Sequence, residues 1–192
     1  VEYMAPAGVV LSSLWTGGGD VWAVATNGTT YRRRTGSWAA VTSPTTSALY
    51  GASGNGQSDV WAAGFNSTVL HGDGNTWTVV PTTGLPTTLL YSILAMSPTD
   101  VWVVGTGGLI GHYDGTSWTS VTSPTTALLR HIHGSAGNDL WTVGAAGTVL
   151  HWDGAAWSSV PIGTDGNLRA VWPLSGHTWI VGESGAILHK AP

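Results

Sequence analysis

The chain alternates short strand-like runs with turns. In residues 129–160 the runs read LRHIH, DLWTVG, GTVLHW and AWSSV, and Gly, Asn or Asp residues separate them. Short runs of apolar and β-branched residues bounded by turn residues are typical of β-strands. No window keeps apolar residues at positions i, i+3, i+4 and i+7, so the pattern predicts strands and no helix.

A repeated Asp-Val-Trp motif divides the chain into units of about 40 residues. The motif is DVW at Asp20, Asp59 and Asp100, DLW at Asp139 and HTW at His177. A second tryptophan follows the first by 16 residues in four copies, so changes of length fall between the units. We predict repeats over approximately residues 11–46, 47–88, 89–126, 127–167 and 168–192, the last joined by residues 1–5.

Four strands in a unit of this length indicate the blade of a β-propeller. The five units predict an all-β fold, with one five-bladed β-propeller over residues 1–192 and four antiparallel strands in each blade. The fifth unit ends after its third strand, and residues 1–5 match the position of the missing fourth strand. We therefore predict that the N-terminal strand closes the last blade, because an open row of blades leaves unpaired strand edges.

Recurrent glycine and aspartate residues identify the turns. Between the second and third strands lie Gly28, Gly108, Gly147 and Gly185, with Ser67 in the second unit. Glycine at this place indicates a hairpin backbone with positive φ. The hairpin between the third and fourth strands turns at Asp-Gly pairs, which contain Asp73, Asp114 and Asp153.

The DVW aspartates also have a structural interpretation. Each lies just before a strand, where an Asp side chain can accept hydrogen bonds from the backbone N–H groups of a turn. A ring of Asp20, Asp59, Asp100 and Asp139 around a cation is the alternative. Because His177 interrupts that ring and calcium requires six to eight oxygen ligands, we predict no metal site.

The composition narrows the range of partners. Charged residues make up only 8% of the chain and the net charge is −4, so no basic surface is available to neutralise phosphates and we exclude nucleic acid. Cysteine is absent, and no apolar run is long enough for a membrane helix. An uncharged surface rich in Thr, Ser, Asn and Gly is commoner outside the cytoplasm. We therefore expect an exported protein, located outside the cell, on its surface or in a periplasm.

The repeats resemble a known group. DVWVVGTGGLIGHYDGTSW and DLWTVGAAGTVLHWDGAAW resemble the short-blade propeller repeats grouped with the BNR or Asp-box superfamily. They are also similar to the repeats of photosystem II assembly propellers and of secreted bacterial proteins. The aspartate stands four residues before its tryptophan, as in Asp153 and Trp157, whereas an Asp-box has five. Five blades resemble tachylectin-type lectins in architecture only.

The Asp-box resemblance raises a glycoside hydrolase as a remote alternative. A sialidase-type site would combine an arginine cluster, a Tyr-Glu nucleophile pair and an aspartic acid. Here Arg32, Arg33 and Arg34 crowd one outer strand, and most acidic residues occupy equivalent positions in different blades. A glycosidase needs two carboxylates about 5 to 10 Å apart, and no such pair can be nominated. We therefore predict a non-catalytic module with no catalytic residues and no cofactor.

Imidazole and indole side chains are the candidate ligand-binding groups. His71, His112, His151 and His189 occupy one place in four units, and Arg32 takes that place in the first. Either each histidine contacts a backbone carbonyl or stacks on a tryptophan, or the set forms one sugar site per blade. His131 and His133 occur in one unit only, and they indicate either packing or a local specialisation.

Tryptophans divide into packing residues and exceptions. Trp38, Trp77, Trp118 and Trp157 begin the outermost strands, where large rings usually pack between blades. Trp15, Trp152 and Trp172 break the repeat, so an exposed aromatic platform is expected there first. We predict multivalent, lectin-like carbohydrate binding, whose avidity comes from several weak sites. The alternative is a protein–protein scaffold or a surface or assembly factor, and the oligomeric state is left open.

Overall fold

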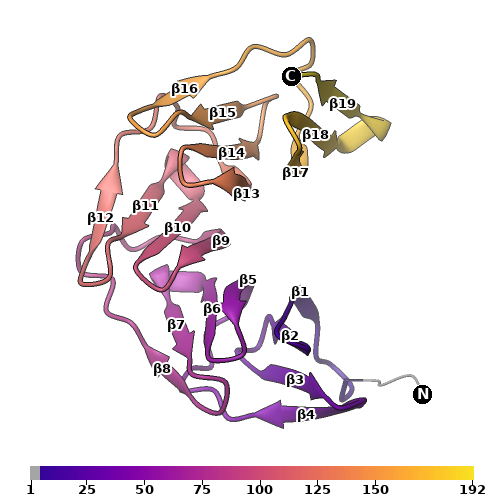
Figure 1. Ribbon diagram of the computed structural model, residues 1–192, viewed down its shortest axis with the longest axis vertical. Coiled ribbons are helices and arrows are strands. Elements are labelled where there is room, and N and C mark those ends of the chain that lie inside the picture. Colours follow the sequence, from indigo (N-terminus) through magenta and orange to yellow (C-terminus); the bar gives the residue numbers. More distant parts are fainter. Residues whose placement is uncertain (1–4) are drawn as a thin grey trace.

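The computed structural model describes residues 5–192 and consists of five separate antiparallel sheets, each lying within one sequence repeat (Figure 1). Four sheets have four strands, and the fifth has three within the described residues. Three single turns of 3-10 helix join second and third strands, and the described residues contain no α-helix. The predicted all-β class and the division into five blades are confirmed.

The strands of each blade follow one another in chain order. The first blade comprises β1 (Leu11–Gly17), β2 (Asp20–Ala25), β3 (Thr30–Arg34) and β4 (Ser37–Val41). The second comprises β5 (Leu49–Gly56), β6 (Asp59–Gly64), β7 (Val69–Gly72) and β8 (Trp77–Val79). The third comprises β9 (Leu90–Ser97), β10 (Asp100–Gly105), β11 (Ile110–Tyr113) and β12 (Trp118–Val121). The fourth comprises β13 (Leu129–Ala136), β14 (Asp139–Gly144), β15 (Val149–Trp152) and β16 (Trp157–Ser159). The fifth comprises β17 (Leu168–Leu174), β18 (His177–Gly182) and β19 (Ile187–Lys190).

The blades lie along an arc whose concave side is lined by the first strand of each blade (Figure 1). The outer strands β4, β8, β12 and β16 lie on the convex side, and β17–β19 stand apart from β1–β4. The predicted closing strand covers residues 1–5, of which 1–4 lie outside the described residues, while Ala5 belongs to no strand. Closure of the ring by the N-terminal strand therefore stays a prediction.

The two end blades expose apolar side chains that their interior counterparts bury. Ile187 on β19 is 71% exposed, whereas Val149, at the equivalent place on β15, is 2% exposed. Leu14 on β1 and Trp172 on β17 are also exposed. These faces lack the neighbouring blade that covers the same positions inside the arc.

Large apolar side chains fill the space between adjacent blades. The ring centroids of Trp77 on β8 and Trp22 on β2 of the preceding blade are 5.2 Å apart, with an edge-to-face geometry. Trp157 on β16 meets Trp102 on β10 in the same way, at 5.9 Å. Both outer tryptophans are buried, so the prediction that these rings pack between blades is confirmed for the two pairs.

Side chains on the inner strands also join the blades through hydrogen bonds. Ser92 Oγ accepts the backbone N–H of Ile132 at 3.3 Å, and His131 Nδ1 accepts that of Val171 at 3.3 Å. An inner strand is an edge strand of its sheet, so its outward N–H groups need partners of this kind. Serine and histidine thus have the same role at equivalent places in successive blades. Ser13 Oγ does the same for the N–H of Ala52.

The turn between the second and third strands requires a left-handed backbone, as predicted. Gly108 has φ 71°, and a Cβ atom there would lie 2.0 Å from the carbonyl oxygen of Thr125 in the connection to the next blade. Ser67 adopts φ 54° in the second blade, where its hydroxyl donates to the carbonyl of Pro86 at 2.7 Å. The other three positions, Gly28, Gly147 and Gly185, have φ 80°, 64° and 75°.

Candidate functional site

The DVW aspartates join side chains of their own blade. Asp59 Oδ1 accepts the indole N–H of Trp61 at 2.8 Å and lies 2.8 Å from Nε2 of His71. The imidazole also lies against the indole, with ring centroids 4.3 Å apart and the planes tilted by 32°. One carboxylate therefore braces the second strand against the third. The same arrangement occurs in two more blades, at Asp100–Trp102–His112 and Asp139–Trp141–His151.

The structure gives these carboxylates other partners than the turn N–H groups that we expected. Side chains two residues apart on a strand share a face, so Asp59 and Trp61 point the same way. His71 pairs directly with Trp61 across the hairpin, which places its ring over that face. The two-residue spacing of Asp and Trp in the motif, together with the register of the hairpin, would therefore have been enough to predict the contacts among Asp59, Trp61 and His71.

The first and fifth blades use different polar groups at the same place. Arg32 Nε donates to Asp20 Oδ2 at 2.7 Å, and its guanidinium lies over the ring of Trp22, 5.3 Å from the centroid. In the fifth blade Nδ1 of His177 lies 2.8 Å from Nε2 of His189. Each blade therefore fills this place with a pair that links its second and third strands.

The Asp-Gly hairpins behave as predicted. Asp153 Oδ1 accepts the backbone N–H groups of Ala155 and Ala156 at 2.8 and 2.9 Å. These bonds stabilise the charged carboxylate and lower its pKa from the ordinary value. In Asp114 the bond from the Thr116 hydroxyl acts first, and with two backbone N–H groups it lowers the pKa to about 2. Asp73 accepts the N–H groups of Asn75 and Thr76 in the same manner.

The candidate ligand-binding side chains are not brought together. Nε2 of His71, His112 and His151 is engaged by a carboxylate inside its own blade, and His189 stacks on Trp179 and contacts His177. Trp15 and Trp152 pack against the apolar clusters between blades. Trp172 differs from all of these, because it is 55% exposed and faces the concave side.

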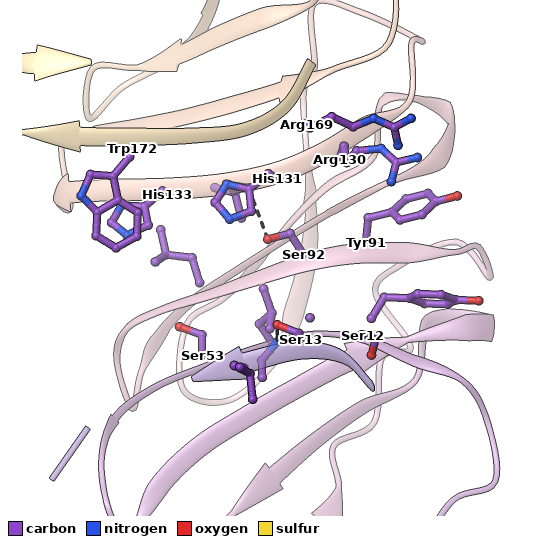
Figure 2. A pocket seen from close by; sticks show the side chains of 17 residues that line it. Ser12, Ser13, Ser53, Tyr91, Ser92, Arg130, His131, His133, Arg169 and Trp172 are labelled. Atoms are coloured by element: carbon purple, nitrogen blue, oxygen red, sulfur yellow. Dashed lines mark hydrogen bonds between the residues drawn. The ribbon is translucent and has the colours of Figure 1, made fainter. Parts of the chain in front are cut away.

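A pocket of about 540 Å³ lies on the concave side and receives residues from the first strand of every blade (Figure 2). Residues 12–14, 50–53, 91–94 and 130–133 line it, together with Arg169 and Trp172. Figure 2 shows Arg130, Arg169 and Tyr91 at one end and His133 and Trp172 at the other. The pocket therefore combines a polar, cationic end with an aromatic end.

Four side chains form a row at the cationic end, which we call the Tyr-Arg ladder: Tyr50, Tyr91, Arg130 and Arg169. The tyrosine rings have centroids 5.8 Å apart, and the guanidinium of Arg130 lies over Tyr91, 5.0 Å from its centroid. Arg169 pairs with Glu183 at the outer edge of the row. No acidic residue lines the pocket, although the chain has a net charge of −4. The ladder end of the pocket therefore holds two guanidinium groups, of which Arg169 is paired with Glu183 and Arg130 forms no ion pair among the described residues.

The ladder residues lie at equivalent places in the inner strands, each directly after a buried leucine and inside a β-bulge. Leu49, Leu90, Leu129 and Leu168 are buried and immediately precede the four ladder residues. Each ladder residue falls at a register shift between its inner strand and the second strand of the blade, so it lies in a β-bulge, which can turn a side chain toward the concave side. Our sequence interpretation missed the ladder because it searched for one residue type at equivalent places. The usable signal was the place itself, directly after a recurrent leucine.

The aromatic end of the pocket holds two histidines with lowered pKa values. Burial lowers the pKa of His131 from 6.5 to about 4, and the nearby His133 contributes to the same shift. Burial also lowers the pKa of His133, whose ring centroid lies 4.0 Å from that of Trp172. The imidazole of His131 is therefore neutral at ordinary pH and serves as the acceptor between the fourth and fifth blades.

Two further observations concern metals and membranes. In the part of the chain that the structure describes, no group of three or more His, Asp or Glu side chains is placed to hold a metal ion. Residues 5–192 also form no helix of the length and apolarity needed to span a membrane.

Solved propellers share the arrangement of the blades. YCF48 bound to D1 peptide superposes with a TM-score of 0.71 at 18% identity, over 99% of this chain and 66% of that chain. YCF48 from Cyanidioschyzon merolae gives 0.76 at 16% identity, over 98% and 69%. A chain of a mitotic checkpoint complex gives 0.81 at 12% identity, over 98% and 63%. At these identities the likeness concerns the fold, and the chain spans about two thirds of each matched structure.

The sequence comparisons give a family. No curated protein matches the chain significantly. The sequence profile of the DUF6242 beta propeller domain, in contrast, matches residues 62–175, which is more than half of the chain. The matched segment begins in β6, ends in the turn after β17, and includes the whole third and fourth blades. The chain therefore belongs to the DUF6242 β-propeller domain family.

Proposed function

We propose that this domain is a non-catalytic module that binds a polypeptide partner along its concave side. The observation that carries the proposal is the pocket to which all five blades contribute their inner strands. It presents tyrosine, arginine and tryptophan side chains, the residue types most enriched at the energetic centres of protein interfaces. The similar structure described as YCF48 bound to D1 peptide supports a peptide-binding role for this architecture.

The shape of the pocket also favours an extended ligand. Its residues follow one another across five adjacent strands instead of surrounding a single point. A segment of polypeptide lying across the strands would contact the residues of the Tyr-Arg ladder one after another, and Trp172 would flank it near the other end of β17. Tyrosine and tryptophan provide large contact areas with little loss of side-chain freedom, so they suit such a surface.

Glycan binding is the second candidate, and it rests on one observation. The exposed indole of Trp172 beside the imidazole of His133 forms an aromatic surface on which a sugar could stack. The proposed one-site-per-blade arrangement has less support, because His71, His112 and His151 already hold a carboxylate. Export from the cytoplasm stays a prediction from composition, which detection of a signal peptide in the full reading frame would test.

Parallel peptide and glycan arrays test the proposal. The labelled domain should bind a subset of short random-sequence peptides, and the double variant Tyr50→Ser/Tyr91→Ser should lose about tenfold in affinity. Serine is present at the equivalent place in the first blade, Ser12, so this variant is compatible with the fold. Val79→Ser, which changes an exposed residue on the outer strand β8, is the matched control. Binding to glycans without peptides, or equal peptide binding by the double variant, would refute the proposal.

A further inference from the structure

We infer that the arginine end of the Tyr-Arg ladder binds a carboxylate group of the partner polypeptide; this inference rests on the proposed function and adds the chemistry of recognition. Arg130 and Arg169 occupy equivalent places on the adjacent strands β13 and β17. Both line the concave pocket, and both also line a second pocket of about 220 Å³ beside it. The two guanidinium groups thus stand between two recesses that a ligand can enter.

Arg130 is positioned for an anion that the protein itself does not supply. Its guanidinium lies over the ring of Tyr91, which fixes its orientation while leaving its N–H donors free of a carboxylate. Among the described residues, no acidic side chain forms an ion pair with Arg130. A planar guanidinium held in this way matches a carboxylate with two parallel hydrogen bonds.

Arg169 is held beside it by Glu183. The pKa of Glu183 is lowered by a hydrogen bond from Asn167 and next by one from Arg169, and Arg130 adds a weaker Coulomb attraction. Glu183 therefore occupies the outer edge of the cationic site with a carboxylate of the chain's own. The two guanidinium groups thus already attract one carboxylate. A carboxylate of the ligand would compete with Glu183 for the same positive charge.

A carboxylate explains the site better than a cation or a neutral group. The pocket lining contains Arg130 and Arg169 and no Asp or Glu, on a chain of net charge −4. Glu183 neutralises one of the two guanidinium charges, and the positive charge that is left attracts anions and disfavours cationic peptides. Both sources of a peptide carboxylate, an acidic side chain and the C-terminal group, share this chemistry, and the test separates them.

The experiment uses the tightest peptide from the random-sequence array and its amide analogues. One analogue replaces every Glu by Gln and every Asp by Asn, and the other has an amidated C-terminus. Fluorescence anisotropy should show a loss of about tenfold for one of the two analogues, which identifies the source of the carboxylate. Arg130→Gln and Arg169→Gln should each cause a similar loss with the original peptide. Combining the sensitive analogue with either variant should add little further loss, because both changes remove the same interaction.

Two variants separate recognition from folding. Arg33→Gln removes the same charge from the exposed end of the third strand, β3, and should bind like the wild type. Glu183→Gln removes the competing carboxylate and should tighten binding by about threefold, a gain that a damaged fold cannot produce. Thermal melting of all four variants monitors folding.

The outcomes distinguish the two proposals. If peptides bind but both amide analogues bind equally well, the carboxylate inference is overturned while the proposed function stands. An equal loss in Arg33→Gln, or weaker binding by Glu183→Gln, also overturns the inference. If no peptide binds, the proposed function fails. Capture of sialylated or sulphated glycans by the same arginines would replace both proposals with an anionic-glycan site.

Discussion

Replacing His131 by serine should make the fold less sensitive to acid. His131 lies on β13 and accepts the N–H of Val171 in the next blade at 3.3 Å. Ser92 and Ser13 make the corresponding bond between other blades, so serine can keep the acceptor while removing the group that titrates. The substitution therefore keeps the hydrogen bond to Val171 while it removes the protonation of the imidazole.

The magnitude follows from the pKa shift. Burial lowers the pKa of His131 from 6.5 to about 4 in the folded protein, while the unfolded chain has the ordinary value. Between these values the unfolded state binds more protons, so the stability is complete above about pH 6.5 and falls as the pH falls toward 4. One pKa unit corresponds to about 1.4 kcal/mol, which gives a loss of about 2 kcal/mol at pH 5 and about 3 kcal/mol at pH 4.

Urea unfolding followed by tryptophan fluorescence at pH 7 and pH 5 measures the effect. The wild type should lose about 2 kcal/mol more than His131→Ser between the two pH values. His133 keeps its own contribution in both proteins, because burial lowers its pKa in the same direction. The carboxylates with lowered pKa values, such as Asp114, lose their stabilising effect only below about pH 4, outside this window.

A second variant and a clear negative result complete this test. His131→Ala removes both the titrating ring and the acceptor, so its pH dependence should also flatten, but it should be less stable than His131→Ser at pH 7. The difference is the cost of leaving the buried N–H of Val171 without a partner, about 1–3 kcal/mol. Equal pH dependence of the wild type and His131→Ser would refute the assignment of His131 as a buried neutral acceptor.

Three further predictions concern the blades. Asp100→Ala should lower the free energy of unfolding by about 2 kcal/mol in urea titrations, because it leaves the Trp102 indole N–H and the His112 imidazole without their carboxylate partner. An unchanged unfolding midpoint would contradict the bracing role of Asp100. Gly108→Ala should cost at least roughly twice as much as Gly107→Ala, because both have positive φ but only Gly108 faces a backbone oxygen at 2.0 Å; equal costs would show that strain alone decides. We expect the exposed apolar side chains of the fifth blade to promote self-association at high protein concentration, so light scattering should show less association of Trp172→Ser/Ile187→Ser than of the wild type, and equal scattering by both would contradict this expectation.

The repeat pattern was sufficient for most of the fold. The two recurrent tryptophans, the turn glycines and the Asp-Gly pairs predicted the strands of each blade and the packing of Trp77 and Trp157. These features repeat because each solves the same local packing or turn problem in every blade. Closure of the ring cannot be predicted from the packing and turns inside each blade. It depends on a contact between distant parts of the chain, and four of the five residues predicted to make it, 1–4, lie outside the described residues.

The site was harder to predict for a related physical reason. The histidines represented by His71 recur because each braces its hairpin through a carboxylate, so their repetition reports blade stability. The places that follow the recurrent leucines of the inner strands, which are buried in all blades but the first, face the concave side and have no packing role in common. Those places are free to differ, and they hold Ser12, Tyr50, Tyr91, Arg130 and Arg169 in the five blades.

A repeat protein with one binding surface therefore separates two kinds of position. Residues that hold a blade together recur in most units, as the Asp-Trp-His groups of the second, third and fourth blades do, whereas one ligand lying across several blades meets a different part of itself at each. A binding surface is then expected where the residue at one exposed position of the repeat differs from blade to blade and that position faces a pocket. Arg130 and Tyr91 satisfy both conditions, and His112 and Trp102 satisfy neither. If exchanging Tyr91 with Arg130 left the preferred peptides unchanged, this distinction would fail, because the order of side chains along the ladder would then carry no specificity.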